Sequence, residues 1–334
     1  MLYYPNIPFA LYHIIKAKNL VFYTAANPSI ENAGIGTESK YETLQLIPEK
    51  YVPKTVLHLA NSNVNKTLQK IQELEISFPL IAKPDIGFRG LLVEKIESKP
   101  ELISYLGKYP IAILVQEFLS EENECGIFYH RLPNDKNGKI TSITLKEFLH
   151  VFGDGKSNLE QLIKKDIRAK LYLEIVRKNP SFCLKTIIKK GEKLKLSSIG
   201  NHSKGTQFIN GNHLISTELE KTIDILNQKV NGWYYGRLDV KYNSLEDLEK
   251  GNFKILELNG ILAEPTHIYD ASKTSYLQAL KEIRTHWKKL SMIARINHDE
   301  KKVPYQSTKK LISDVIQLKK YTKKVAKLSK TNYF

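Results

Sequence analysis

The sequence predicts a mixed α+β fold, and three observations lead to this fold class. Residues 235–259 form two strand-like runs in which apolar and polar side chains alternate with a period of two. Residues 311–325 instead repeat apolar side chains at helical spacing. The chain has 334 residues, of which 42% are hydrophobic and 26% charged. This composition is typical of a globular protein long enough for two or more compact units.

The runs between residues 235 and 259 predict two strands that share a polar face. In the first run Arg237 and Asp239 lie two residues apart, so both project from the same face. In the second run Glu257 and Asn259 have the same spacing. Residues 243–252, between the runs, carry the Asn, Ser and Gly that are typical of a hairpin connection.

Antiparallel pairing of these strands would bring Asp239, Glu257 and Asn259 together, with Arg237 beside them. By the same alternation, Ile255 would lie on the face of Glu257. Carboxylate and amide oxygens suit Mg²⁺, which takes its remaining ligands from water and nucleotide phosphates, and Mn²⁺ is the alternative ion. The other interpretation is an ordinary charged face on a solvated antiparallel sheet.

A second group of residues upstream suggests an anion site. A strand that contains Lys83 leads into a turn with Gly87, Arg89 and Gly90, and a further strand is predicted at residues 91–93. Glycines let backbone N–H groups approach an anion closely, and the lysine and arginine add positive charge. Ordinary turn glycines are the alternative, since the phosphate-loop pattern GxxxxGK[ST] is absent.

Other segments have the patterns of ordinary elements. The Asn- and Gly-rich residues 25–36 predict a loop, and Ser39-Lys40 then predicts the start of a helix. Lys40 could equally be a first-turn surface lysine. Further helices are predicted at residues 66–74 and 99–106, and further strands at 78–84, 111–116 and 126–131.

The net charge of +16 is concentrated toward the end of the sequence, since residues 281–330 contain 15 Lys and Arg against 4 Asp and Glu. Leu311, Val315, Leu318, Tyr321 and Val325 recur there at helical spacing among lysines. We expect an amphipathic helix docked on the body with a solvated lysine face. Contact of this tail with a membrane surface or with nucleic acid is the less favoured interpretation.

Cysteine usage and the first residues predict a cytoplasmic protein. Cys125 and Cys183 belong to no CxxC or Cys/His spacing, so neither a disulfide framework nor a zinc site is expected. Prolines and lysines interrupt the apolar N-terminal stretch, and no basic segment precedes it, which disfavours a signal peptide. No apolar run is long enough to span a bilayer.

The order of these motifs is more informative than any one of them. A strand with Lys83 and a glycine turn comes first, followed by Gln116-Glu117-Phe118-Leu119 and a glutamate shortly after. An Arg-x-Asp strand at residues 237–239 and a Glu-x-Asn strand at 257–259 complete the series. Together they resemble the ATP-grasp superfamily over about residues 38–290. By motif order the likeness is to D-alanine-D-alanine ligases and to the ATP-grasp part of cyanophycin synthetases.

The resemblance implies an ATP-grasp fold, in which two α/β lobes with antiparallel sheets clasp ATP. The implied divisions are a short N-terminal segment (1–75) in place of a full preceding domain, a small lobe (76–125), a large lobe with the metal site (126–290) and a basic helical tail (291–334).

The resemblance also implies roles for individual residues. Phosphate and nucleotide contacts would come from Lys40, Lys83, Gly87, Arg89, Gly90, Gln116, Glu117, Leu119 and Glu124. Within this set Gln116, Glu117 and Leu119 would hold adenine, and Glu124, with Glu122 as its rival, would bind the ribose. The Mg²⁺ ligands would be Asp239, Glu257 and Asn259. Arg237 would steady the transferred phosphoryl group, together with Lys83 and with His202 and Lys204 from a later loop.

The implied reaction is transfer of a phosphoryl group from ATP to a substrate carboxylate, followed by attack of an amine on the acyl phosphate. An amino acid or small peptide is the expected substrate. The turn after Asn259 carries Glu264 and His267 as substrate residues, and the negative charge of Glu264 favours an amine or cationic group there. The alternatives are a kinase-like phosphotransferase, or a non-catalytic basic protein that binds nucleotide or nucleic acid.

Overall fold

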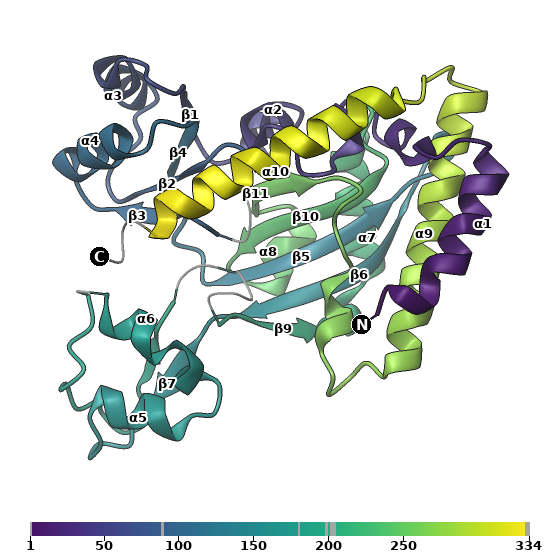
Figure 1. Cartoon of the computed structure of the whole chain (residues 1–334). Coiled ribbons are helices and arrows are strands. Elements are labelled where there is room, and N and C mark those ends of the chain that lie inside the picture. Colours follow the sequence, from purple (N-terminus) through teal and green to yellow (C-terminus); the bar gives the residue numbers. More distant parts are fainter. Residues whose placement is uncertain (1, 88–89, 180, 198–199, 201–204, 331–334) are drawn as a thin grey trace. The chain divides into compact units, whose positions relative to one another are not determined.

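The computed structural model describes residues 2–87, 90–179, 181–197, 200 and 205–330. The chain divides into two compact units (Figure 1). The first combines residues 1–145 with residues 210–334, and the second comprises residues 146–209. The helices and strands of each unit are described separately below.

The first unit contains a four-stranded antiparallel sheet in the order β1-β4-β2-β3. Its strands are β1 (Thr55–His58), β2 (Leu80–Pro84), β3 (Glu94–Ile96) and β4 (Ile113–Glu117). Helices α3 (Val64–Glu73) and α4 (Lys99–Lys108) pack against it. Leu80, Ile96 and Leu102 are fully buried in this core. The helices and strands predicted at 66–74, 78–84, 99–106 and 111–116 are therefore confirmed.

The strand predicted at residues 91–93 is wrong, because the chain is still turning there. Gly90 has a φ of 71° and Leu92 a φ of 56°, both in the left-handed region. These residues prolong the turn, and β3 begins only at Glu94.

A second antiparallel sheet in this unit includes β11, β10, β5 and β6 in that order. These strands are β5 (Asn123–His130), β6 (Lys139–Glu147), β10 (Tyr235–Tyr242) and β11 (Lys254–Asn259). Helices α7 (Thr217–Asn227) and α8 (Leu245–Lys250) supply apolar residues to its core. Leu219, Ile223, Trp233 and Leu248 are buried there. The strand predicted at residues 126–131 is confirmed within β5.

The connection between β10 and β11 differs from the predicted hairpin, because it contains the helix α8. Ser244 caps the helix by accepting a hydrogen bond from the Asp247 backbone N–H at 3.1 Å. Gly251, with a φ of 78°, ends it. The cap and the C-terminal glycine favour a helical turn over an extended loop.

A β-bulge in β11 changes which of its side chains lie on each face of the sheet. Asp239 pairs with Glu257, but the next residue, Val240, pairs with Ile255, so Leu256 is skipped. Ile255 and Leu258 are therefore both buried, whereas Glu257 faces the other way. The prediction that Ile255 shares the face of Glu257 is wrong for this reason.

The N-terminal part and α9 pack against the opposite side of the second sheet. Helix α1 (Ile7–Ala17) lies alongside α9 (Tyr276–Asp299) (Figure 1). Phe128 and Tyr235 of the sheet are buried against Ile293 of α9. Helix α2 (Lys40–Gln45) begins after Ser39, whose side chain accepts from the Glu42 N–H at 3.1 Å, which confirms the predicted start.

Short 3₁₀ helices connect these elements. They are η1 (Tyr4–Asn6), η2 (Phe22–Ala25), η3 (Glu31–Ala33), η4 (Glu49–Tyr51), η5 (Ala169–Tyr172), η7 (Asn212–Leu214) and η8 (Thr266–Tyr269).

The basic tail forms α10 (Thr308–Lys330), which docks on the body of the first unit as predicted. Leu311 is 5% exposed and Val325 is 2% exposed, and Val325 belongs to the core of the β1-β4-β2-β3 sheet. The Lys324 ammonium donates to the Pro110 carbonyl at 3.2 Å. Val315, which has the same helical phase, is 47% exposed, so the buried stripe is interrupted.

The second unit is small and has its own core. It contains β7 (His150–Phe152), α5 (Leu159–Lys165) and α6 (Leu173–Arg177), which Figure 1 labels. Strand β8 (Lys193–Lys195) comes after these helices and pairs with β7. Leu149, Leu159 and Ile163 are buried within it. Strand β9 (Gln207–Asn210) ends the segment.

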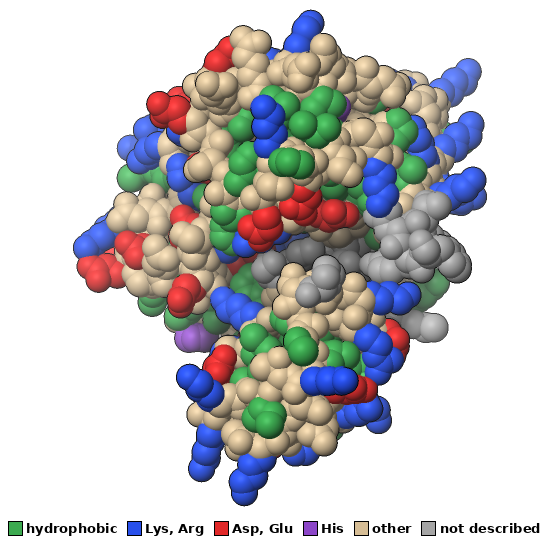
Figure 2. All heavy atoms as spheres, turned by 90° about the vertical axis from the view of Figure 1, so that its left-hand side faces the viewer, with side chains coloured by type: hydrophobic (Ala, Val, Ile, Leu, Met, Phe, Trp, Pro, Cys, Tyr) green, Lys and Arg blue, Asp and Glu red, His purple; other side chains and the backbone are tan. Residues whose placement is uncertain are grey.

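Two surface properties bear on partners. On the face drawn in Figure 2, Lys and Arg side chains are spread over the surface and do not gather into one patch. No helix in the described part of the chain is long and apolar enough to cross a membrane.

The docking of α10 can be tested with two valines of the same helix. Val325→Ala should lower the free energy of unfolding by about 2 kcal/mol, because it leaves a cavity in a packed core. Val315→Ala, at an exposed site, should change it by about 0.5 kcal/mol or less. Urea denaturation of both variants checks this, and equal effects would contradict the docking.

Candidate functional site

The pairing of β10 with β11 brings the predicted metal ligands together. Asp239 lies directly opposite Glu257, and Arg237 lies opposite Asn259, as the sequence predicted for an antiparallel pair. Asp239 is buried, with an exposed fraction of 6%. Gly236 allows the two strands to approach, because a Cβ there would lie 1.9 Å from the Asn259 carbonyl oxygen.

Asp239 is held by a bidentate ion pair with Arg237. The guanidinium Nε lies 2.7 Å from Oδ1, and Nη2 lies 3.1 Å from Oδ2. Burial disfavours the charged guanidinium, but the attraction and hydrogen bonding of Asp239, together with the charges of Glu257 and Glu264, outweigh it and raise the pKa of Arg237. Nη1 of the same guanidinium donates to the Glu264 carbonyl at 3.3 Å, which places the turn after β11 next to this pair.

Glu257 is held by Lys40, from the start of α2. The ammonium lies 2.9 Å from Oε1 of Glu257. Burial opposes both charges, yet the mutual attraction raises the pKa of Lys40 and lowers the pKa of Glu257. Lys40 also reaches toward the turn after β2, with its ammonium 3.5 Å from the Gly87 carbonyl.

Lys83, on β2, completes the charged cluster. Its ammonium donates to Oε1 of Gln116 at 3.0 Å and to the Leu256 carbonyl at 3.4 Å. Burial lowers the pKa of Lys83 to about 8, against the opposing attraction of Glu257. Both predicted phosphate lysines, Lys40 and Lys83, therefore lie beside the carboxylates of β10 and β11.

The donor set fits a magnesium ion. Asp239 and Glu257 supply carboxylates, and the Nδ2 position of the Asn259 amide is buried with no hydrogen-bond partner among the described residues. Amide oxygen and nitrogen positions are interchangeable in such an assignment, so this orphaned position could present the oxygen. No group of three or more His, Cys, Asp or Glu side chains forms a metal cluster in the described part of the chain. Two carboxylates and an amide match an ion that keeps waters and phosphate ligands.

The residues predicted to hold adenine lie at the end of β4. Gln116 is 1% exposed, and its side chain bridges Lys83 and the Thr55 hydroxyl, to which it donates at 2.9 Å. The Glu117 carboxylate accepts from the Lys54 backbone N–H at 3.0 Å. The Gln116 side chain therefore orients Lys83 by hydrogen bonding, a role that the sequence did not reveal.

Leu119 and Glu124, the other predicted adenine and ribose contacts, lie near Lys241 of β10. The Lys241 ammonium donates to the Leu119 carbonyl at 3.3 Å. Glu124, which is 6% exposed, pairs with Lys241 in the register of β5 and β10. Their nucleotide roles stay predictions.

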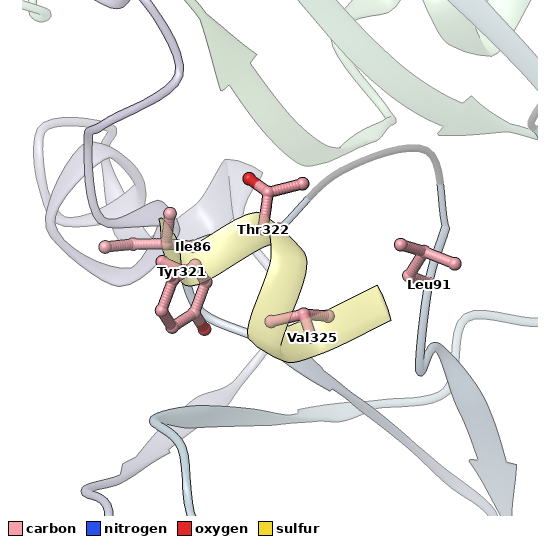
Figure 3. A pocket seen from close by; sticks show the side chains of 6 residues that line it. Ile86, Leu91, Tyr321, Thr322 and Val325 are labelled. Carbon is pink, nitrogen blue, oxygen red and sulfur yellow. The ribbon is translucent and has the colours of Figure 1, made fainter. Parts of the chain in front are cut away.

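The glycine turn after β2 packs against α10. Ile86, Gly87 and Leu91 line one small pocket, together with Tyr321, Thr322 and Val325 (Figure 3). The helical spacing of Tyr321 and Val325 indicated a buried face, but sequence alone could not show that the face covers this turn. Arg89, His202 and Lys204 lie outside the described residues, and Gly90 adopts the positive φ that the turn requires.

Glu264 is held by two phenols that sequence reasoning missed. Its carboxylate accepts hydrogen bonds from the hydroxyl groups of Tyr3 and Tyr269, the latter at 2.7 Å. Burial, followed by the bond to Glu264, raises the pKa of Tyr269 to about 12, so this phenol stays a donor. Tyr3 comes from the far end of the chain and stacks on Trp287, and no local pattern links it to Glu264.

His267 lies in the same turn but is only 2% exposed. Its Nδ1 is 2.6 Å from the Ser142 hydroxyl on β6. Burial, followed by the nearby His286, lowers the pKa of His267 to about 4, so the ring is neutral at physiological pH. This placement supports the packing of the turn, and the predicted substrate role stays a prediction.

The low pKa of Lys83 predicts a specific pH dependence of stability. Its folded pKa of about 8 lies below the ordinary 10.5, so the unfolded chain binds this proton more tightly and the contribution of Lys83 to stability rises as pH increases between these values. Between about pH 7 and about pH 10, the free energy of unfolding of wild type should therefore rise by about 2 kcal/mol relative to that of Lys83→Met.

Urea denaturation at both pH values measures this difference. Lys221→Met, at an exposed lysine of α7, is the matched control. If the difference in free energy of unfolding between wild type and Lys83→Met does not change with pH, the pKa of Lys83 is not lowered by burial.

A family model matches the part of the chain that carries many of these residues. Residues 37–132 match the model of the RimK-like ATP-grasp domain. No curated protein sequence matches the chain.

Several solved structures are similar to the chain at low identity. The VanG D-Ala:D-Ser ligase of Enterococcus faecalis is 15% identical over 77% of this chain and 64% of its own, with a TM-score of 0.45. A D-alanine–D-alanine ligase of Bacillus anthracis is 14% identical over 79% of this chain and 71% of its own, with a TM-score of 0.43. A bifunctional glutathione synthetase of Pasteurella multocida is 14% identical over 69% of this chain and 33% of its own, with a TM-score of 0.37.

The chain thus spans less than two thirds of the first of these ligases and about a third of the synthetase. At TM-scores below 0.5 these likenesses add no weight to the family match. The matched segment contains Lys83 and the 116–119 run, two of the motifs whose order carries the resemblance, and also Lys40. Residues 37–132 are therefore similar to a RimK-like ATP-grasp domain, and the structure has the mixed α+β fold that the sequence predicted.

Proposed function

We propose that the chain is an ATP- and Mg²⁺-dependent carboxylate–amine ligase that forms an amide through an acyl phosphate on an amino acid or small peptide. One observation carries this proposal. Lys40 and Arg237 are paired with two carboxylates, those of Glu257 and Asp239, where α2, β10 and β11 meet. A third cation, Lys83 of β2, joins them by donating to the Leu256 carbonyl of β11. Such a cluster offers sites for a metal ion and for polyphosphate at the same place.

The carboxylate side of the cluster would hold the divalent ion. Asp239, Glu257 and Asn259 would be its protein ligands, and when bound the ion supplies neutralising charge to phosphate oxygens. In the free protein the same carboxylates are paired with Arg237 and Lys40. Binding of magnesium and ATP would therefore replace both ion pairs. The metal ion would bind the two carboxylates, and the phosphates would bind Lys40 and Arg237.

The cationic side of the cluster would position the phosphates. Gln116 and the Leu256 carbonyl fix the Lys83 ammonium, so little side-chain freedom is lost when phosphate binds. Proximity to phosphate would raise the pKa of Lys83 and keep it charged. Arg237 lies between Asp239 and the turn that carries Glu264, where a fixed positive charge could stabilise the transferring phosphoryl group.

The two chemical steps would proceed as follows. A substrate carboxylate oxygen attacks the γ-phosphorus of ATP, the bond to the bridging oxygen breaks, and ADP leaves. The amine then attacks the acyl carbon, inorganic phosphate leaves with the bonding electrons, and the amine nitrogen releases a proton to give the amide. The chain's contribution is positioning and charge stabilisation.

Glu264 would select the amine. Two phenol donors fix its carboxylate, and its backbone carbonyl accepts from Arg237. A carboxylate retains lone pairs for further donors after accepting two hydrogen bonds. A cationic or amine group on the acceptor is the complementary ligand. A cytoplasmic location, like the choice of Mg²⁺ over Mn²⁺, stays a prediction.

ATP turnover tests the proposal most directly. ADP release with Mg²⁺ across a panel of amino acids and dipeptides should depend on the carboxylate substrate, and Glu257→Gln should reduce it by about 100-fold or more. Glu246→Gln, at an exposed carboxylate of α8, is the matched control and should keep full activity.

Three results would point elsewhere. Undiminished turnover in Glu257→Gln would contradict the site. A stable phosphorylated product that forms without an amine would indicate the kinase-like alternative. Tight binding of Mg-ATP with no turnover on any substrate would favour a nucleotide-binding protein without catalysis.

The role of Glu264 has a separate signature. Glu264→Gln should raise the KM for the amine acceptor by about tenfold, since a charge-assisted hydrogen bond is lost, while the KM for ATP stays constant. Tyr269→Phe is the comparison, because it removes one hydroxyl but keeps the carboxylate charge. Steady-state kinetics with each substrate varied in turn measures both constants. If the KM for the amine acceptor is the same in wild type and Glu264→Gln, Glu264 does not select the amine.

A further inference from the structure

The outward face of α1 is an apolar stripe with no partner in the described part of the chain. Ile7, Leu11 and Ile15 are 47%, 52% and 75% exposed, and their spacing of four residues aligns them along one side of the helix. Tyr4 and Tyr12, at 69% and 54% exposed, widen the stripe. Exposed apolar residues scattered singly need no explanation, but a continuous row on one helix face marks an interaction surface.

The inward face fixes this orientation. His13 is 5% exposed, and Ile14 and Ala17 pack against the core that α9 shares with the second sheet. At the start of the helix, the Arg284 guanidinium of α9 donates to Oδ1 of Asn6 at 2.7 Å. The helix is therefore docked on the body by this inward face, and the stripe on its other side is left facing water.

Positively charged residues lie on α1 and on the neighbouring helix α9. Residues 1–30 contain Lys16 and Lys18 but no Asp or Glu. The adjacent α9 adds Lys288 and Arg295, and these two charges, with that of Lys16, assist burial in lowering the pKa of His13. Cations from both helices thus lie close to α1.

We propose that α1 is a membrane-surface helix that lies on a bilayer with anionic headgroups. Ile7, Leu11 and Ile15 would enter the boundary between headgroups and acyl chains, and Lys16 and Lys18 would contact lipid phosphates. The exposed tyrosines are of the type that favours this boundary. The helix has 11 residues, so it would lie along the surface and not span it.

Charge complementarity favours this partner over a second copy of the chain. In a two-fold dimer the same patch meets itself, so the cations of α1 and α9 in one copy would face those in the other. No acidic residue in the first thirty residues could pair with them. An anionic bilayer offers both an apolar layer for the stripe and negative charge for its border.

Vesicle flotation of the full chain tests the proposal. Wild type should float with vesicles of phosphatidylcholine and phosphatidylglycerol and not with phosphatidylcholine alone, and raised salt should weaken the binding. Leu11→Ser with Ile15→Ser should reduce the bound fraction by about tenfold or more. Lys16→Glu with Lys18→Glu should abolish the preference for the anionic vesicles.

A matched control lies on α10, where Ile312 and Ile316 are 56% and 49% exposed. Ile312→Ser with Ile316→Ser should bind vesicles as wild type does. Urea denaturation verifies that each variant keeps its fold. The proposal is overturned if wild type does not bind anionic vesicles, or if the α1 and α10 variants lose binding equally. A concentration-dependent dimer that Leu11→Ser with Ile15→Ser disrupts, without vesicle binding, would assign the stripe to a second copy.

Discussion

Two opposed carboxylates on neighbouring strands determine much of the architecture around the candidate site. Asp239 and Glu257 face each other across β10 and β11, and each would repel the other if left unpaired. Arg237 offsets the first charge from within the same strand, but the second needs a cation from elsewhere. Lys40 supplies it, so α2 must begin where its ammonium can reach β11.

The position of α2 follows from a small hydrogen-bond network. The Ser39 hydroxyl and the Tyr41 backbone N–H both donate to Oδ1 of Asp85, at 3.0 Å and 2.9 Å, and Asp85 directly follows β2. Helix α2, which carries Lys40, and strand β2, which carries Lys83, are therefore fixed to each other without a ligand. Buried ion pairs of this kind add little net stability, since desolvation offsets the attraction, but they keep charged groups ready for a ligand.

The sequence predicted the components of the site better than their partners. The spacing of two residues was enough to place Asp239, Glu257 and Asn259 on one face, because strand geometry allows little else. The bulge that turns Ile255 inward could not be predicted, since it depends on cross-strand register. The same holds for Tyr3 against Glu264 and for Tyr321 against the glycine turn, where side chains distant in sequence meet only through tertiary packing.

The burial of Val325 in the core of the β1-β4-β2-β3 sheet has a consequence for synthesis on the ribosome. Every strand of that sheet lies before residue 118, yet a side chain that seals its interior is translated more than two hundred residues later. Until residue 325 has emerged, the nascent sheet therefore leaves the apolar surface beneath Val325 open to water. During that interval chaperones that hold apolar segments would find their binding site on this sheet.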